Sequence, residues 1–217
     1  MDAPYHRAIL HQAIGQRVSA RALSAITAAN LGQDSLAGLL HPEYHYDDSQ
    51  FEQSQAYVEE CRQAAGRALD PAVAWAAFGR LTHAVQDFYA HSKYVQLWAD
   101  LQTLIPGEKD TDRASLPPPA KMKALDAFLL KHPKLKSGRL YLPLEALWLV
   151  PPLQPLLKVL LPKDSHAWMN LDNPRAGALF PYAVEAAVQR TVFEFERTLG
   201  LIGETRGQLA MKQFVDQ

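Results

Sequence analysis

The stretch from Gly79 to Ser92 reads GRLTHAVQDFYAHS and places His83, Asp87 and His91 at positions i, i+4 and i+8. On an α-helix these three side chains lie along one face, each one turn from the next. Imidazole nitrogens and carboxylate oxygens are the usual ligands of hydrolytic zinc. Two such groups one turn apart can hold one ion, and a third can reach toward a second ion. The stretch therefore predicts a metal-binding edge on a helix.

The alternative is a helix that carries two partly exposed histidines. Apolar neighbours argue against exposure, since Trp75, Phe78, Leu81, Val85 and Phe88 surround much of the same helix. A buried histidine or aspartate needs partners that offset its desolvation. A metal site is therefore favoured over an exposed face.

Helical periodicity continues on both sides of this stretch. Asp70-Pro71 is a cap followed by proline, so the central helix should open there and run to about His91, or onward to Leu101. Further helices are expected over about 4–30 and from a Ser49–Glu52 capping box. Three more segments complete the pattern: a short helix over 120–131, an apolar, proline-punctuated segment over 140–161, and a last helix from Pro174 or Pro181 to about Leu199, ended by Gly200 and Gly203.

Composition fits an all-α, single-domain, multi-helix bundle over 1–217, with a proline-rich loop and apolar insertion at about 106–162. Hydrophobic residues make up 48% of the 217 residues, and the net charge is -1. No overall basic field recruits nucleic acid, which disfavours a nucleic-acid partner. The lone Cys61 excludes an intramolecular disulfide. No signal peptide is seen, so the protein is expected in the cytoplasm as synthesised, or exported without a signal.

Other segments offer further ligands. His6 lies on the inner stripe of the first helix and is either a core residue or a ligand. His45 is followed by Asp47, which could orient it, or the run is a turn with aspartate caps. His166 lies in a polar run that contains Asp172, just before the last helix.

Together these pieces resemble the zinc-dependent phospholipase C and single-strand nuclease superfamily, in particular its Het-C-like branch. The resemblance rests on Ala29-Asn30, on Asp34, on His45-Tyr46-Asp47-Asp48 and above all on the block from His83 to Tyr94, and covers about 5–100 and 164–195. It implies two or three zinc ions with Asp87 as a bridge. The implied ligands are His6, His45, His83, Asp87, His91 and His166.

The same resemblance implies that Asp34 is the general base, which would orient or deprotonate a zinc-bound water. Secreted relatives also use their N-terminal amine as a ligand. Late in the chain the relatives have a His-x-x-x-Glu pair, whereas here the comparable place reads His166-x-x-x-Asn170, so that Asp172 or Glu185 would substitute. Asp47 would be an orienting residue or an alternative ligand.

The functional expectation is a zinc-dependent phosphodiester hydrolase, most simply a phospholipase C acting on phospholipid head groups. The alternatives are a single-strand nuclease on the same scaffold and a non-catalytic toxin or interaction protein. Trp148, in the 140–161 segment, would suit a lid or a membrane-facing surface, although a buried helical hairpin is favoured for that segment. No obligate protein partner is evident.

Overall fold

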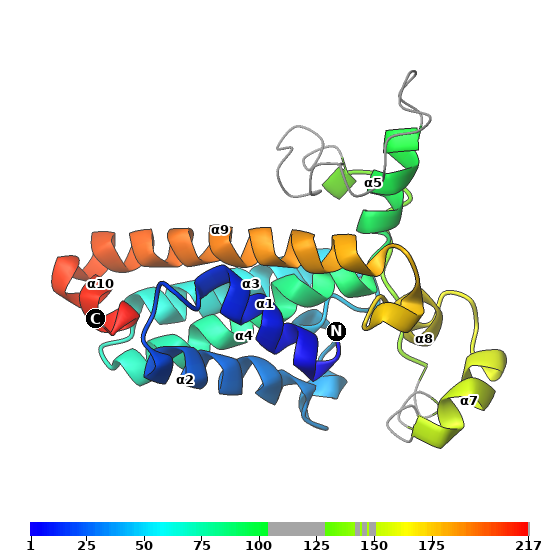
Figure 1. Ribbon diagram of the computed structural model, residues 1–217, viewed down its shortest axis with the longest axis horizontal. Helices are drawn as coiled ribbons and strands as arrows, with labels where there is room; N and C mark the ends of the chain where they lie inside the picture. Colours follow the sequence, from blue (N-terminus) through cyan, green and yellow to red (C-terminus); the bar gives the residue numbers. More distant parts are fainter. Residues whose placement is uncertain (104–128, 142–143, 145–146, 148–150, 217) are drawn as a thin grey trace.

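The computed structural model describes residues 1–103, 129–141, 144, 147 and 151–216. Over these ranges it contains α-helices, short 3-10 helices and no strand, which confirms the all-α class. Figure 1 shows the long helices running along the length of the molecule, with α5 and α7 projecting at one end. The bounds of the main helices are α1 Ala3–Ile14, α2 Ala20–Leu31, α3 Phe51–Arg67, α4 Pro71–His91, α5 Tyr94–Thr103, α7 Gln154–Leu160, α8 His166–Met169, α9 Phe180–Arg206 and α10 Gln208–Val215.

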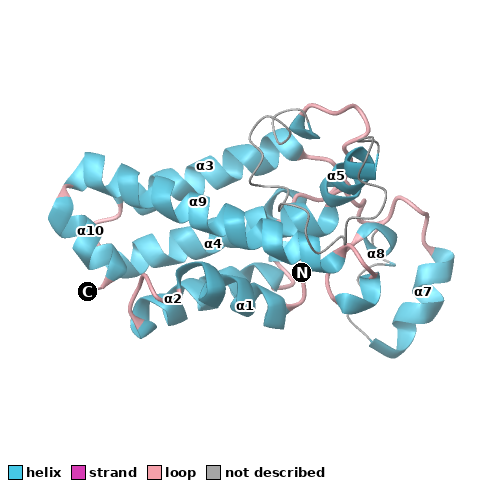
Figure 2. Cartoon of the chain, turned by 45° about the horizontal axis from the view of Figure 1, so that its top comes forward, coloured by secondary structure: helices cyan, strands magenta, loops and turns pink. Residues whose placement is uncertain are grey.

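Helix α4 is the centre of the bundle and packs against α2, α3 and α9 (Figure 2). Its N-terminus is the predicted one, since the Asp70 side chain accepts a hydrogen bond from the Ala72 amide at 2.8 Å. From Ala74 onward nearly every side chain of α4 is buried, which is unusual for a helix with so many polar residues. Burial on all sides commits those polar groups to partners within the protein.

Gly79 sets the distance between α4 and α2. A Cβ atom at this position would lie 2.3 Å from the Ile26 carbonyl oxygen, closer than any real contact. The missing side chain therefore lets the two backbones approach closely, which brings Asn30 of α2 within reach of the polar face of α4.

The first helix predicted over 4–30 is wrong, because the chain bends after Ile14 and restarts as α2 at Ala20. Ser19 caps the second piece, its hydroxyl accepting from the Ala22 amide at 3.1 Å. The Ser19 amide donates to the Val215 carbonyl at 2.9 Å, so contact with the C-terminal end of the chain holds the bend in place. The long apolar stripe is thus shared between two helices.

Two other predicted boundaries are corrected. Ser49 does not cap α3: its backbone is left-handed, at φ 56°, and its hydroxyl accepts from the Ser137 amide instead. Gly200 and Gly203 do not end α9, which continues to Arg206 and stops at Gly207, where φ is 83°. The predicted end of the central helix at about His91 is confirmed, and α5 is a separate helix rather than an extension of α4 to Leu101.

The described part of the 140–161 segment is not the buried hairpin that was favoured. Leu156, Val159 and Leu160 of α7 are 61%, 78% and 60% exposed, whereas Leu157 and Leu161 are buried against Ala167. Trp148 and the predicted 120–128 part of a helix lie outside the described residues. No helix among the residues that the structure describes is long and apolar enough to cross a membrane.

A chain of backbone hydrogen bonds brings the segment before α8 to the end of α4. The Gly138 amide donates to the His91 carbonyl at 3.0 Å, and the His166 amide donates to the Arg139 carbonyl at 2.9 Å. His166 is thereby held next to the last turn of α4, although 75 residues separate it from His91 in the sequence.

Candidate metal centre

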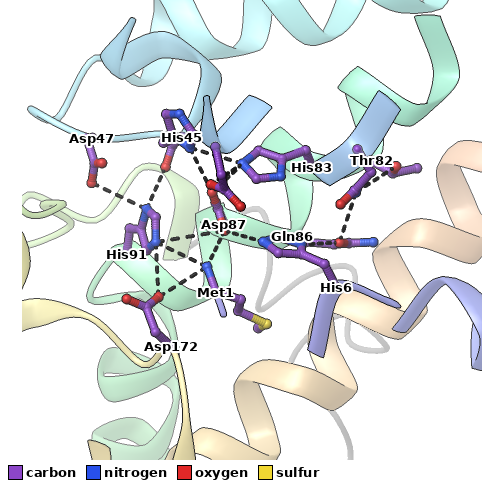
Figure 3. A network of polar contacts seen from close by, with 12 residues as sticks. Met1, His6, His45, Asp47, Thr82, His83, Gln86, Asp87, His91 and Asp172 are labelled. Atoms are coloured by element: carbon purple, nitrogen blue, oxygen red, sulfur yellow. Dashed lines mark hydrogen bonds and ion pairs between the residues drawn. The ribbon is translucent and has the colours of Figure 1, made fainter. Parts of the chain in front are cut away.

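His83, Asp87 and His91 lie along one buried edge of α4, as Figure 3 shows. Their exposed fractions are 0%, 1% and 4%. Oδ2 of Asp87 lies 3.0 Å from Nε2 of His83, and Oδ1 lies 3.7 Å from Nε2 of His91. The carboxylate therefore lies between the two imidazoles and presents one oxygen to each.

The first ligand group joins this edge to the loop that follows α2. Asp34, His45, His83 and Asp87 each offer a ligand atom, and these atoms lie within 4.8 Å of one another. Nδ1 of His45 is 3.0 Å from Oδ2 of Asp87 and 3.0 Å from Nε2 of His83, so that two ring nitrogens and a carboxylate oxygen converge. His45 and His83 are buried, whereas the Asp34 side chain is 40% exposed. Asp34 thus forms the solvent side of this group.

The second ligand group lies at the end of α4. Asp47, His91 and His166 offer ligand atoms within 4.8 Å of one another. Oδ1 of Asp47 lies 3.4 Å from Nδ1 of His91 and 3.2 Å from Nδ1 of His166. On the opposite side of the rings, Asp172 lies 3.1 Å from Nε2 of His91 and 3.5 Å from Nε2 of His166. Both imidazoles are therefore held between two carboxylates.

One nitrogen of His91 is already committed. Nδ1 also lies 3.0 Å from the His45 backbone carbonyl, which can only accept a hydrogen bond. A metal-binding histidine normally donates one ring N–H to a carbonyl or carboxylate and binds the ion through the other nitrogen. By this pattern Asp47 and the carbonyl would orient the rings, and Nε2 of His91, beside Asp172 and Asp87, would be the nitrogen left for an ion.

His6 of α1 and the Met1 amine, which precedes that helix, complete the cluster. The His6 ring stacks on the His83 ring with 4.5 Å between centroids, and its Nε2 lies 3.2 Å from Oδ1 of Asp87. The Met1 amine lies 2.5 Å from the same oxygen, 3.1 Å from Oδ1 of Asp172 and 3.3 Å from Nε2 of His91. Positive charge from the amine is thus placed among the acceptors that would surround an ion.

Positive groups of the protein itself face the buried carboxylates of the cluster. Burial would raise the pKa of Asp87, but the Met1 amine and the neighbouring histidines outweigh it and hold that pKa well below its usual range. Burial lowers the pKa of His91, yet Asp87 and Asp47 raise it to about 9. For His83 burial wins over Asp87, and its pKa falls to about 4. Protonated His91 and the amine therefore balance the carboxylates here.

All of the predicted His and Asp residues with described positions come together here: His6, Asp34, His45, Asp47, His83, Asp87, His91, His166 and Asp172. Glu185, the other candidate for the late carboxylate, instead accepts from Gln189 on its own helix at 2.9 Å. Trp148 lies outside the described residues. Sequence reasoning gave no role to Gln86, Asn30 and Thr191, which bond beneath the cluster, although Gln86 lies inside the decisive stretch and Asn30 is among the residues that carry the resemblance.

The donor set suits zinc. Zinc is bound in proteins by imidazole nitrogen and carboxylate oxygen, usually with four ligands. Nε2 of His6, Nε2 of His45 and Nδ1 of His83 make no hydrogen bond with the described residues, although these atoms are buried. Buried imidazole nitrogens without such partners are unusual in a finished hydrogen-bond network. The residues present therefore fit a metal ion.

Fold and site together define an all-helical domain with a buried histidine–aspartate cluster. The chain belongs to the family described as the VWA7 N-terminal domain, whose model matches residues 5–113. It is 36% identical over 80 residues to von Willebrand factor A domain-containing protein 7 of Rattus norvegicus and 39% identical over 80 residues to the protein of that name from Homo sapiens. Each match covers 35% of this chain and 9% of the relative. No solved structure matches.

The family match corrects the resemblance drawn from the sequence. The matching family and both relatives are VWA7 proteins, so the assignment to the phospholipase C and nuclease superfamily, with its Het-C-like branch, is wrong. The expected phospholipase C, hydrolase and lipid-directed functions, together with the alternatives built on that scaffold, fall with it. The cluster is defined by the distances between its side chains and does not depend on the family assignment. The residues from His6 to His91 lie inside the matched region.

Proposed function

We propose that this chain is a zinc-binding helical domain that holds two ions in the buried cluster at the end of α4. The carrying observation is Asp87, whose Oδ2 lies 3.0 Å from ring nitrogens of both His45 and His83 and whose Oδ1 faces His6 and His91. A carboxylate placed in this way can serve two ions. Nε2 of His6, which is buried without a hydrogen bond to the described residues, lies 3.2 Å from Oδ1 of Asp87 and would supply a further ligand.

The first ion would be held by His45, His83 and Asp87, with Asp34 on the solvent side. The second would be held by His91, His166 and Asp172, with Oδ1 of Asp87 shared. When bound, zinc supplies positive charge that offsets the buried carboxylates, and Lewis acidity at the open Asp34 side. His6, whose Nε2 lies 3.2 Å from Oδ1 of Asp87, would add a ligand beside the shared oxygen.

A metal-free hydrogen-bond network is the competing interpretation, and metal analysis separates the two. The full chain is purified without added metal and without a histidine tag, and its zinc content is measured by mass spectrometry. About two zinc ions per chain are expected, and a content near zero after zinc loading and desalting would overturn the assignment. His11→Ala is the matched control, because His11 is an exposed residue of α1 away from the cluster.

Bound zinc should also stabilise the fold. If the dissociation constant of the ion from the folded state is a hundredfold below the free ion concentration, binding raises the free energy of unfolding by about 2.7 kcal/mol. Chelation is therefore expected to lower the thermal midpoint, and zinc, more than magnesium, to restore it. Cytoplasmic location, the presence of an enzyme activity and contact with a membrane surface stay predictions.

A further inference from the structure

A hydrogen-bond network beneath the cluster joins four helices at His6. It consists of Asn30 on α2, Thr82 and Gln86 on α4, and Thr191 on α9, and each of these side chains is completely buried. Oε1 of Gln86 lies 2.6 Å from Nδ1 of His6 and 3.2 Å from Nδ2 of Asn30. Nε2 of Gln86 lies 3.1 Å from Oγ1 of Thr191. The labelled members are seen in Figure 3.

The orientation of the Gln86 amide follows from the acceptor that the Thr191 hydroxyl uses. The Thr191 hydroxyl donates its one hydrogen to the Ala187 carbonyl at 2.8 Å, so its oxygen can only accept from Gln86. The amide nitrogen of Gln86 must then face Thr191. Its carbonyl oxygen is left facing His6.

The contacts of Asn30 match this orientation and leave its Oδ1 buried without a hydrogen bond to the described residues. The Thr82 hydroxyl donates to the Gly79 carbonyl at 2.8 Å, so its oxygen accepts from Nδ2 of Asn30 at 3.1 Å. The amide nitrogen of Asn30 therefore points inward, and it also donates to Gln86 at 3.2 Å. A carbonyl oxygen is the acceptor that this second donor requires.

These hydrogen-bond directions select one tautomer of the His6 ring. Because Oε1 of Gln86 can only accept, Nδ1 of His6 must carry the hydrogen. Nε2 then carries the lone pair when the ring is neutral. This atom makes no hydrogen bond with the described residues and lies 3.2 Å from Oδ1 of Asp87.

We propose that Gln86, fixed by Thr191 and Asn30, is a positioning residue that holds His6 in the Nδ1–H form with Nε2 aimed at the metal centre. This role rests on the proposed zinc binding. Orienting partners of metal-bound histidines normally contribute about 10–100-fold in metal affinity. Gln86 touches no ion itself and acts through His6.

The test uses the full 217-residue chain in two states. In metal-free protein labelled with ¹⁵N-histidine, two-bond correlation spectra report which ring nitrogen carries the hydrogen. Wild type should show His6 protonated at Nδ1, and Gln86→Leu should lose this preference. Zinc affinity, measured by competition with a chelating dye, should fall 10–100-fold in Gln86→Leu. Gln86→Glu keeps an acceptor for Nδ1 and should retain most of the affinity.

Two further variants keep the outcome decisive. Thr191→Val removes the hydroxyl that accepts from Gln86, with little change in side-chain volume. The Gln86 amide can then rotate, and His6 should show a mixture of its two tautomers. This variant serves in place of Gln86→Leu if Gln86→Leu fails to fold. Gln189→Leu is the control, because this glutamine bonds to Glu185 away from the cluster. Nε2–H on His6 in metal-free wild type, or wild-type zinc affinity in folded Gln86→Leu, would overturn the positioning role. Wild-type protein that binds no zinc would overturn both the metal centre and the positioning role of Gln86. The tautomer of His6 would in that case still show whether Gln86 accepts a hydrogen bond from Nδ1.

Discussion

Nε2 of His83 lies 3.0 Å from Oδ2 of Asp87, one helical turn further along α4. The same oxygen faces His45 at 3.0 Å, and the other oxygen faces His6 at 3.2 Å. A single carboxylate therefore contacts histidines from three segments of the chain, and in the proposed two-ion arrangement it is the ligand that both ions share.

Asp87→Asn is expected to remove both zinc ions. The amide keeps the size of the side chain but loses the negative charge and one acceptor, so neither group retains its central ligand. Zinc content by mass spectrometry should fall from about two ions to near zero, with helicity by circular dichroism unchanged. Asp164→Asn is the matched control, because Asp164 is exposed and accepts from Tyr141. Two ions retained in Asp87→Asn would exclude a bridging carboxylate.

Asp172 and Asp47 are expected to differ, although both contact His91 and His166. Asp172 faces the Nε2 atoms and should be a ligand, so Asp172→Asn should lose one ion. Asp47 faces the Nδ1 atoms and should orient the rings, so Asp47→Asn should keep both ions with roughly 10–100-fold weaker binding of one. Zinc titration of the two variants compares them directly. The reverse result would place the second ion on the Asp47 side of the rings.

Metal-free protein is expected to lose stability as the pH rises from about 6.5 to about 9. The pKa of His91 is lowered by burial but raised further by Asp87 and Asp47, to about 9. Since the folded pKa lies above the ordinary value, the stabilisation is complete below pH 6.5 and disappears as the pH passes the folded value. The pKa of His166 is also raised, because Asp47 and Asp172 outweigh burial.

Urea midpoints measured at several pH values, with a chelator or with zinc, test this dependence. Zinc competes with protons for the same imidazoles, so zinc-loaded protein should gain from rising pH where metal-free protein loses. His91→Asn should flatten the metal-free curve over this window. A metal-free midpoint that stays constant or rises between pH 6.5 and 9 would contradict the assigned charge on His91.

The sequence predicted the central helix and the alignment of its polar edge because both are local. Asp70-Pro71 marks the start of α4, and a spacing of four residues is sufficient to stack His83, Asp87 and His91. The bend before Ala20 was missed because the Ser19 amide bonds to Val215, at the far end of the chain. Gly203 was mistaken for a helix end, whereas its missing side chain gives room to Met211 of α10.

The sequence indicates which residues could join the cluster but not how they come together. Candidate ligands on α1, on the loop before α3 and before α9 are visible as residue types, but their approach depends on tertiary contacts. Gln86 has no signal of its own, since its role follows from bonds to Asn30 and Thr191 on other helices. Resemblance to the wrong family named residues that the geometry brings together, and their roles as metal ligands stay predictions.

Gly79→Ala and Gly200→Ala form a matched pair for the packing that supports the centre. A Cβ at Gly79 would meet the Ile26 carbonyl at 2.3 Å and must push α2 away, whereas a Cβ at Gly200 meets nothing within 4 Å. Overpacking should lower the free energy of unfolding of Gly79→Ala by about 1–3 kcal/mol. Because Gly200 is helical and exposed, Gly200→Ala should raise the free energy of unfolding by about 0.4–1 kcal/mol. Urea unfolding measures both. Because α2 carries Asn30, Gly79→Ala should also weaken zinc binding, which Gly200→Ala leaves unchanged. Equal stability and zinc affinity in the two variants would show that the close approach of α2 and α4 does not support the site.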